Sequence, residues 1–363
     1  MYSLKELGWS EFFEKQIANE CELIPARLAE ENRELYRVFC EQGEFLAELS
    51  GKLRHEIQSR ADLPAVGDWV QVQPRGENRA TIHRVLQRKG KFSRKIAGRK
   101  TEEQIVAANV DVVFLVSSLN REFNPRRIER YLTLAWDSGA RPVIVLNKVD
   151  LRESSDAEAL CSEAECAAMG LPVILASATR GDGLRELRTV LRGDRVSSES
   201  GVTAALLGSS GVGKSSLINA LLGNEQLPTQ AVRDNDDRGR HTTTSRQLLL
   251  VPGGGVLIDT PGMRELQLWG AADGIGRTFG DIQELAARCK FRDCRHQSEP
   301  GCAVRAAVES EALDAGRVES FQKLEREEQF LEAKQDASLR SERTKKLRKM
   351  MKSVNRFYRE RGR

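Results

Sequence analysis

The sequence lacks long apolar segments. None of its 363 residues belongs to a run of eighteen apolar residues, which argues against a membrane-spanning helix. The N-terminal stretch MYSLKELGWSEFFEKQ has neither the charged start nor the apolar core of a signal peptide. We therefore expect a soluble, cytoplasmic protein with no membrane partner.

The sequence also lacks a strong excess of one charge, since the formal net charge is only +4. The positive charge is nevertheless concentrated in two segments. Residues 84–100 contain eight Lys and Arg and no acid, and residues 339–363 contain eleven Lys and Arg against two Glu. These patches predict a polyanionic partner surface. For the second, a helix packed on its own domain and a membrane-surface helix are alternatives.

A regular disulfide framework is missing, because seven cysteines is an odd number. The segment CKFRDCRHQSEPGC brings together Cys289, Cys294, His296 and Cys302. Three thiolates and an imidazole in one short loop are typical of tetrahedral structural zinc with no open position for catalysis. Reduced, metal-free cysteines or a disulfide are the alternatives. Zinc is favoured because one of only four histidines lies in this loop.

Four regions follow from the patterning of the chain. Residues 1–34 are predicted to be an N-terminal extension, and residues 35–95, with short alternating segments and frequent turns, an all-β barrel like an OB-fold. Residues 96–268 alternate apolar runs with helical patterns, which indicates a three-layer α/β domain. Residues 269–363 are predicted to form an α-rich domain that contains the cysteine loop and the basic tail. The fold class is therefore multidomain.

The segment GSSGVGKSS has the spacing of a phosphate-binding loop and stands between a predicted strand and a predicted helix. Backbone N–H groups and the helix N-terminus would bind phosphates there. Lys214 would neutralise the β- and γ-phosphates, and the Ser215 hydroxyl would bind Mg²⁺. The segment consists of Gly208, Ser209, Ser210, Gly211, Val212, Gly213, Lys214, Ser215 and Ser216.

The segment VLNKVD carries Asn147, Lys148, Val149 and Asp150 at the end of a predicted strand. Asp150 would accept hydrogen bonds from the N1–H and the amine of guanine, which disfavours adenine. The aliphatic part of Lys148 would lie along the base. The segment at Ser177 and Ala178 ends another strand, in the type of loop that binds the guanine oxygen. The motifs at strand ends share the edge where an open α/β sheet binds its ligand.

The segments GRHTTT and DTPGM are predicted to complete the phosphate end of this site. Asp259 would bind a Mg²⁺ water and Gly262 the γ-phosphate. Thr243 would complete the Mg²⁺ shell, although the threonines also suit an edge strand. Met263 stands where many GTPases have a water-orienting glutamine, and a thioether cannot orient water. His241 is the candidate replacement; alternatively, it only pins the loop.

The order of these motifs is unusual, because the guanine motifs precede the phosphate loop, whereas GTPases ordinarily have them after it. The chain can begin and end at a different connection while each strand keeps its place in the sheet. The nucleotide site is then unchanged. We therefore predict a circularly permuted P-loop GTPase. Whatever follows residue 268 is then attached directly to the segment that senses the γ-phosphate.

These motifs, with GDWVQV and the cysteine spacing, resemble one family over nearly the whole chain, the bacterial ribosome small subunit-dependent GTPase A family. The resemblance implies a GTP hydrolase; from the motifs we expect it to use Mg²⁺ and to contain one structural zinc ion, and we expect a monomer. It also implies binding to the 30S subunit late in its maturation, contact with 16S rRNA, and hydrolysis stimulated by the subunit. Two alternatives remain. One is a permuted GTPase that acts on the large subunit. The other is an RNA-binding protein that occupies a site on the ribosome, with bound nucleotide acting only as a latch.

Overall fold

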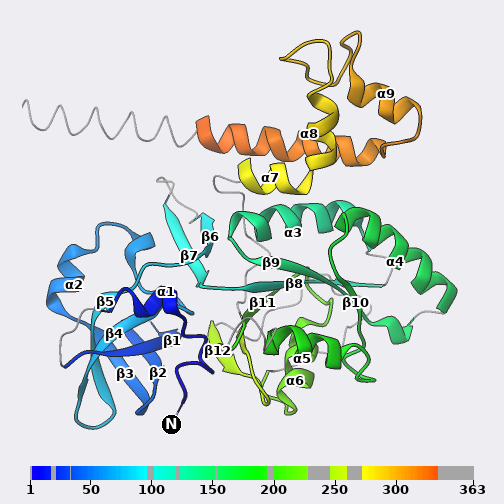
Figure 1. The fold of residues 1–363 in the computed structure, drawn as a ribbon. Coiled ribbons are helices and arrows are strands. Elements are labelled where there is room, and N and C mark those ends of the chain that lie inside the picture. The colour runs from blue at the N-terminus through cyan, green and yellow to red at the C-terminus, as the bar shows by residue number, and fades with distance from the viewer. Residues whose placement is uncertain are drawn as a thin grey trace, which may run out of the picture.

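The computed structural model describes most of the chain (Figure 1). The described residues are 2–17, 22–32, 34–95, 102–119, 123–151, 154–193, 200–227, 246–259 and 272–333. Three of the predicted site residues, His241, Thr243 and Gly262, lie outside these ranges, as do Met263 and the basic tail. Within the described residues, no helix combines the length and the apolar character needed to cross a membrane.

A closed five-stranded barrel forms the N-terminal part of the structure. Its strands pair in the order β1-β2-β3-β5-β4, and β1 also pairs with β4, which closes the barrel. The prediction of a small OB-like barrel is confirmed. The strands are β1 (Ile24–Asn32), β2 (Leu35–Cys40), β3 (Gly43–Leu49), β4 (Trp69–Arg75) and β5 (Arg79–Val85), with α1 (Glu11–Glu14), α2 (Gly51–Glu56) and the 3-10 helix η1 (Arg60–Asp62).

Strand β1 lies in the stretch that the sequence assigned to an N-terminal extension. It pairs with both β2 and β4, so the barrel cannot close without it. Its burial does not alternate, because residues 26–29 are all buried. One of these four is Arg27, and a buried arginine conceals the strand from a search for alternating apolar residues. The domain limits themselves stay a prediction.

The central domain is a sheet with helices on both faces. The order β10-β9-β8-β11-β13-β12 is parallel except for β12. Helices α3 and α4 cover one face, and α5 and α6 cover the other (Figure 1). The elements are β8 (Val112–Ser118), α3 (Pro125–Asp137), β9 (Arg141–Asn147), η2 (Val149–Leu151), α4 (Ser154–Ala168), β10 (Val173–Leu175), α5 (Leu184–Arg192), β11 (Thr203–Leu207), α6 (Lys214–Leu222), β12 (Gln247–Leu250) and β13 (Val256–Asp259).

The strands of this sheet are buried on both sides. In β9, Val143 and Val145 belong to the cluster under α5 and α6, whereas Ile144 and Leu146 belong to the cluster under α3 and α4. This explains the continuous apolar runs in the sequence. Strand β11 lies between β8 and β13, which places the phosphate loop beside strands that precede and follow it in the chain.

Two further parts adjoin the central domain. Strands β6 (Lys91–Lys95) and β7 (Glu103–Ala108) form a separate two-stranded sheet that follows the barrel strands in the chain. The C-terminal module contains α7 (Ala272–Thr278), α8 (Gly280–Ala286), α9 (Ala303–Glu309) and a helix over residues 315–333. The C-terminal module stacks on α3, on the side away from the sheet (Figure 1).

Candidate nucleotide-binding site and metal cluster

The phosphate-loop segment connects β11 to α6, as its sequence predicts. Gly211 and Gly213 have φ values of 75° and 90°, in the region that favours glycine. A Cβ on Gly208 would lie 2.2 Å from the Val116 carbonyl oxygen, so no larger residue fits. The Lys214 ammonium donates to the carbonyls of Gly208 and Ser209 at 2.8 and 2.6 Å. The Lys214 side chain thus folds back over the loop that would hold the phosphates.

Asn147 joins the guanine-reading segment to the phosphate loop. Its side-chain Nδ2 donates to the Val212 carbonyl at 2.8 Å, and the residue is almost fully buried. A Cβ on Gly213 would lie 2.3 Å from the same Nδ2 atom. The two motifs, which are 65 residues apart in the chain, are therefore in direct contact.

Asp150 lies on η2, directly after β9, and is held by the segment that follows β10. Ser177 Oγ donates to one carboxylate oxygen at 2.6 Å, and Thr179 Oγ1 donates to the other at 3.2 Å. The bond from Ser177 holds the pKa of Asp150 below its usual range. The group is therefore an anion at neutral pH, and a carboxylate has capacity for further donors. Ala178 follows Ser177 in the same short segment.

Asp259 is the last residue of β13, the strand next to β11. Burial raises the pKa of Asp259 to about 6, and the nearby Lys214 ammonium opposes that rise. A partly buried carboxylate at this strand end is suited to a divalent cation, whose charge would favour the ionised form.

Two residues of α3 that the sequence did not single out contact the phosphate loop. Arg127 Nη1 donates to Ser209 Oγ at 2.8 Å, and the Tyr131 hydroxyl lies 3.4 Å from the same oxygen. These residues are four positions apart, so they lie on one face of the helix. The segment PRRIERYL shows the helical spacing of these two residues, but the sequence does not show that this helix face contacts the phosphate loop.

The four predicted metal ligands form a cluster between α8 and α9. The candidate ligand atoms of Cys289, Cys294, His296 and Cys302 all lie within 4.8 Å of one another. The Cys289 and Cys302 sulfurs are 3.9 Å apart, which fits two thiolates on one tetrahedral zinc ion with bonds of ~2.3 Å. All four could act as ligands of one metal ion. Within the described residues, no disulfide joins the three cysteines.

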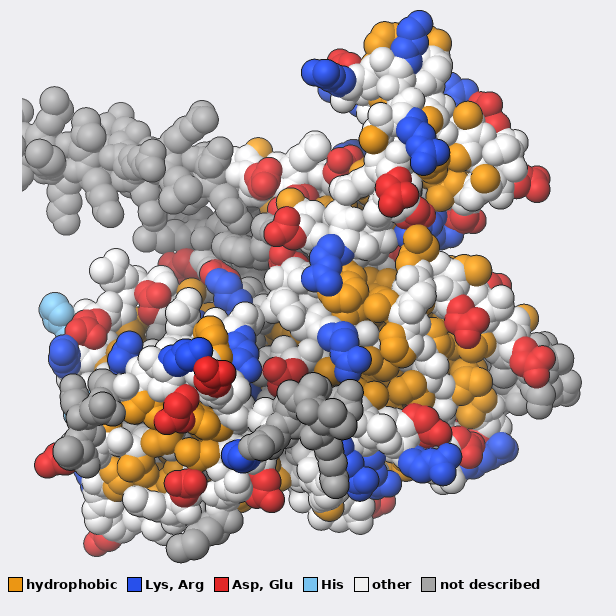
Figure 2. Space-filling model, in the orientation of Figure 1, with side chains coloured by type: hydrophobic (Ala, Val, Ile, Leu, Met, Phe, Trp, Pro, Cys, Tyr) orange, Lys and Arg blue, Asp and Glu red, His pale blue; other side chains and the backbone are white. Residues whose placement is uncertain are grey.

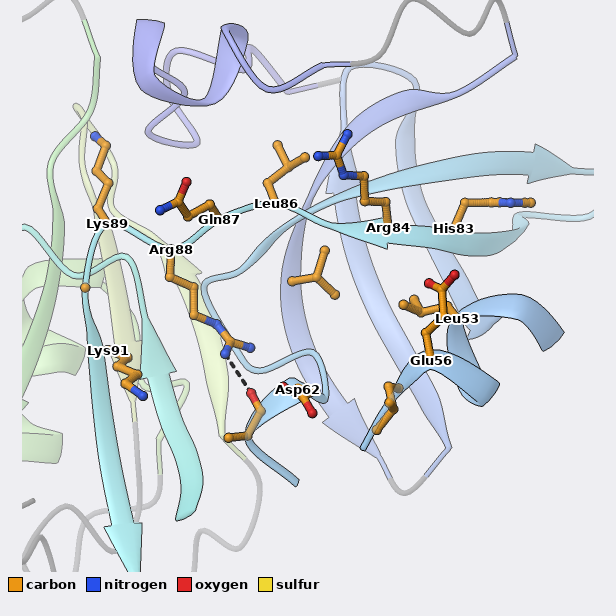
Figure 3. A pocket seen from close by; sticks show the side chains of 14 residues that line it. Leu53, Glu56, Asp62, His83, Arg84, Leu86, Gln87, Arg88, Lys89 and Lys91 are labelled. Carbon is orange, nitrogen blue, oxygen red and sulfur yellow. Dashed lines mark hydrogen bonds between the residues drawn. The ribbon is translucent and has the colours of Figure 1, made fainter. Parts of the chain in front are cut away.

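A basic cavity of about 710 Å³ lies in the barrel, between α2, η1 and the connection from β5 to β6. Figure 3 shows Arg84, Lys89 and Lys91 around it. Arg88, by contrast, is directed to Asp68, with bonds of 2.8 and 2.7 Å to the two carboxylate oxygens. Of the described cations in the basic segment, Arg84, Lys89 and Lys91 are exposed, whereas Arg88 bonds to Asp68 and Arg94 donates to Gln104.

Comparison with known proteins identifies the family. A family model described as RsgA GTPase matches residues 85–269, half of the chain. The chain belongs to the RsgA GTPase family. Membership confirms the predicted family, and with it the prediction of a GTP hydrolase. A second model, described as a 50S ribosome-binding GTPase, matches residues 203–351.

Curated RsgA proteins resemble the chain over nearly its whole length. One from Opitutus terrae, named small ribosomal subunit biogenesis GTPase RsgA, is 46% identical over 93% of both chains. Another of that name, from Streptomyces coelicolor, is 44% identical over 94% of this chain and 90% of the relative.

Two solved structures resemble this RsgA GTPase. The crystal structure of YjeQ from Thermotoga maritima has a TM-score of 0.62 and 29% identity, covering 84% of this chain and 98% of that one. That of YloQ, described as a circularly permuted GTPase, has a TM-score of 0.60 and 23% identity, covering 86% and 97%. The latter likeness concerns the fold alone, and it agrees with the permuted strand order found here.

Proposed function

We propose that this RsgA GTPase binds the 30S ribosomal subunit late in its maturation, contacts 16S rRNA, and hydrolyses GTP when the subunit stimulates it. One observation carries the nucleotide part of the proposal. Asn147 bonds to the Val212 carbonyl, so the guanine-reading segment meets the phosphate loop although their order in the chain is reversed. The names of the relatives support the ribosomal part, because they are described as small ribosomal subunit biogenesis GTPases.

The expected ligands of this site are GTP or GDP and a Mg²⁺ ion. We assign Asp150 to the guanine edge and Lys214 to the β- and γ-phosphates, on the positions described above. Ser215, Asp259 and Thr243 would bind Mg²⁺ or its waters, and Gly262 would meet the γ-phosphate. We also propose that the Cys₃His cluster holds one structural zinc ion, and that the protein acts as a cytoplasmic monomer.

His241 is the proposed water-orienting residue, because Met263 cannot perform that role. His241→Ala should lower the stimulated turnover of GTP and leave the affinity for GTP unchanged. An equal turnover in the variant would leave His241 with no more than a loop-pinning role.

The decisive experiment compares GTP hydrolysis with and without purified 30S subunits. We expect a large increase of the turnover number with 30S subunits, and none for Lys214→Ala, which lacks the cation for the β- and γ-phosphates. If 30S subunits bind but leave turnover unchanged, the nucleotide acts as a latch on an RNA-binding protein and hydrolysis is incidental.

A large-subunit GTPase is the second candidate, because residues 203–351 match a family described as 50S ribosome-binding. Co-sedimentation with separated 30S and 50S subunits distinguishes the two. We expect the chain to pellet with 30S in the presence of a nonhydrolysable GTP analogue. Pelleting with 50S alone would overturn the small-subunit proposal and leave the GTPase assignment intact.

A further inference from the structure

The loop between the first two metal-cluster cysteines carries an exposed aromatic ring. Phe291 is 40% exposed, and the ammonium of its neighbour Lys290 lies 5.6 Å from the ring centroid. A single exposed apolar side chain is ordinary on a protein surface. The surroundings of this ring are what distinguish it.

Four cations lie within four residues of Phe291 in the chain. Arg288, Lys290, Arg292 and Arg295 are all exposed, and the nearby acids are Asp293 and Glu299, whose carboxylate accepts from backbone N–H groups, that of Arg295 among them. In the part of the chain that the structure describes, none of these four cations forms an ion pair with a carboxylate. Figure 2 shows Lys and Arg side chains together with hydrophobic ones over the tip of the C-terminal module. This tip therefore combines an accessible ring with positive charge.

The loop that carries the ring is fixed at several points. Lys290 N donates to the Gly301 carbonyl at 3.1 Å, and Cys294 N donates to the Phe291 carbonyl at 3.4 Å. Cys289 and Cys294, which flank the loop, belong to the metal cluster. A loop that is ordered before binding loses less conformational entropy when a ligand docks.

A second exposed phenylalanine in the same module has fewer cations near it. Phe330, on the helix over residues 315–333, is 66% exposed, more than Phe291. The described charged residues three and four positions before it are Glu327, which pairs with Arg130, and Arg326. Phe330 is therefore an exposed ring with one described cation a helical turn before it, which makes it the matched comparison for Phe291.

We propose that Phe291 and the cations Arg288, Lys290, Arg292 and Arg295 form a platform for an unpaired RNA nucleotide. The base stacks on the Phe291 ring, and the cations contact the phosphates on either side of it. Single-stranded nucleic acid is recognised in this way, by an aromatic face within a positive surface. An acidic protein segment would use the cations but would not need an aromatic face. The inference deepens the proposed function, since it rests on RNA of the small subunit as the partner.

The test measures binding of the full-length, zinc-loaded chain to fluorescent single-stranded oligo(U) and to a duplex RNA of the same length by anisotropy. Phe291→Ala should weaken oligo(U) binding by roughly five- to a hundredfold, the range for loss of one stacked base. Phe291→Tyr should restore binding and Phe291→Leu should not, because stacking needs the ring. Duplex binding should be unchanged, since its bases are already stacked.

Control variants separate the ring from the charges. Phe330→Ala should bind oligo(U) like the unchanged protein. Arg292→Ala should weaken binding and reduce the slope of log affinity against log salt concentration by about one, while Phe291→Ala leaves that slope unchanged. Zinc content measured on every variant identifies any that has lost its metal, and Phe291→Tyr then serves as the folded comparison.

Three outcomes would overturn the inference. The first is full oligo(U) affinity in Phe291→Leu. The second is an acidic polypeptide such as polyglutamate binding with the same dependence on the ring. The third is an unchanged protein that binds no oligo(U) although 30S subunits stimulate its GTP hydrolysis, which leaves the proposed function standing. Conversely, ring-dependent RNA binding without any 30S stimulation would support the platform while the proposed function fails.

Discussion

The two accessory modules are joined to the GTPase domain by physically different means. The barrel continues the central sheet through one backbone pair, between Glu30 of β1 and Gln247 of β12. The C-terminal module instead contacts α3 through a buried ion pair, because Arg317 bonds to Glu129 of α3 at 3.0 Å and, within the module, to Asp281 at 2.9 Å. The barrel junction thus has backbone pairing and the hydrogen bonds of the buried Arg27 to neutral acceptors, whereas the C-terminal junction contains buried ion pairs.

The junction with the C-terminal module contains further ion pairs of α3. Arg130 forms a bidentate pair with Glu327, and Arg126 contacts both Glu129 and Asp314. Helix α3 also carries Arg127, which bonds to the phosphate loop. A single helix therefore contacts the phosphate loop on one side and the C-terminal module on the other. Four substitutions test the comparison, from the largest expected effect to the smallest.

Glu129→Ala should cause the largest loss of stability. The Glu129 carboxylate is fully buried, and its removal leaves Arg317 with a buried charge that Asp281 alone must balance. Breaking a buried pair from one side costs about 3–5 kcal/mol. Urea unfolding, followed by far-UV circular dichroism, measures the change in midpoint.

The matched control is Arg305→Ala, which removes an exposed pair with Glu309 from α9 of the same module. It should change stability by less than ~0.5 kcal/mol. Equal losses of stability in Glu129→Ala and Arg305→Ala would show that the buried ion pairs stabilise this junction no more than an exposed pair does.

Arg27→Met should have the next largest effect, at the barrel junction. The buried guanidinium donates to the Leu7 carbonyl at 2.6 Å, the Asn109 carbonyl at 3.2 Å and Thr203 Oγ1 at 3.1 Å. Burial lowers the pKa of Arg27 to about 10, so its charge is held at a cost. The methionine variant avoids the cost of burying a charge, but the buried acceptors lose their donor. We therefore expect the free energy of unfolding to fall by ~1–3 kcal/mol.

The comparison variant for the barrel is Arg79→Met, since Arg79 is half-exposed and lies 4.0 Å from Glu48. Thermal unfolding of the two variants should differ by several degrees. Identical melting temperatures would contradict a structural role of Arg27 between the barrel and β11.

The sequence was sufficient for the parts of the site that local spacing determines. The phosphate loop and VLNKVD were predicted because a turn between strand and helix, or a strand end, needs those residue types in that order. The first strand of the barrel was missed because Arg27 interrupts its apolar pattern. The partners that satisfy the buried Arg27, at Leu7, Asn109 and Thr203, are far apart in the sequence and could not be recognised from it. Likewise, the sequence did not mark Glu129 as a buried residue, because only the folded chain brings Arg317 to it.

Asp137, at the end of α3, makes the C-terminal junction sensitive to pH. Burial, which is the largest cause, together with Glu328, Asp273 and Glu103 raises the pKa of Asp137 to about 7, and Lys91 opposes that rise. A carboxyl whose folded pKa is raised stabilises the protein below its unfolded pKa near 4, and this contribution is lost as pH rises towards 7.

Asp137→Asn should therefore be more stable than the unchanged protein at pH 8 by ~1 kcal/mol, after allowance for solvent screening. The two proteins should have the same stability near pH 4. Parallel stability profiles from pH 4 to 8, measured by urea unfolding, would contradict the assignment.

Arg246→Gln, at the barrel junction, should have the smallest effect. Arg246 lies 3.6 Å from Glu31, yet burial lowers the pKa of Arg246 and raises that of Glu31, so desolvation offsets their attraction. We expect a change within ~1 kcal/mol and a coupling energy near zero in a double-mutant cycle with Glu31→Gln. The same cycle on Glu129 and Arg317 should give a large coupling. A large coupling between Arg246 and Glu31 would mean that an ion pair also holds the barrel, and the two junctions would then not differ in kind.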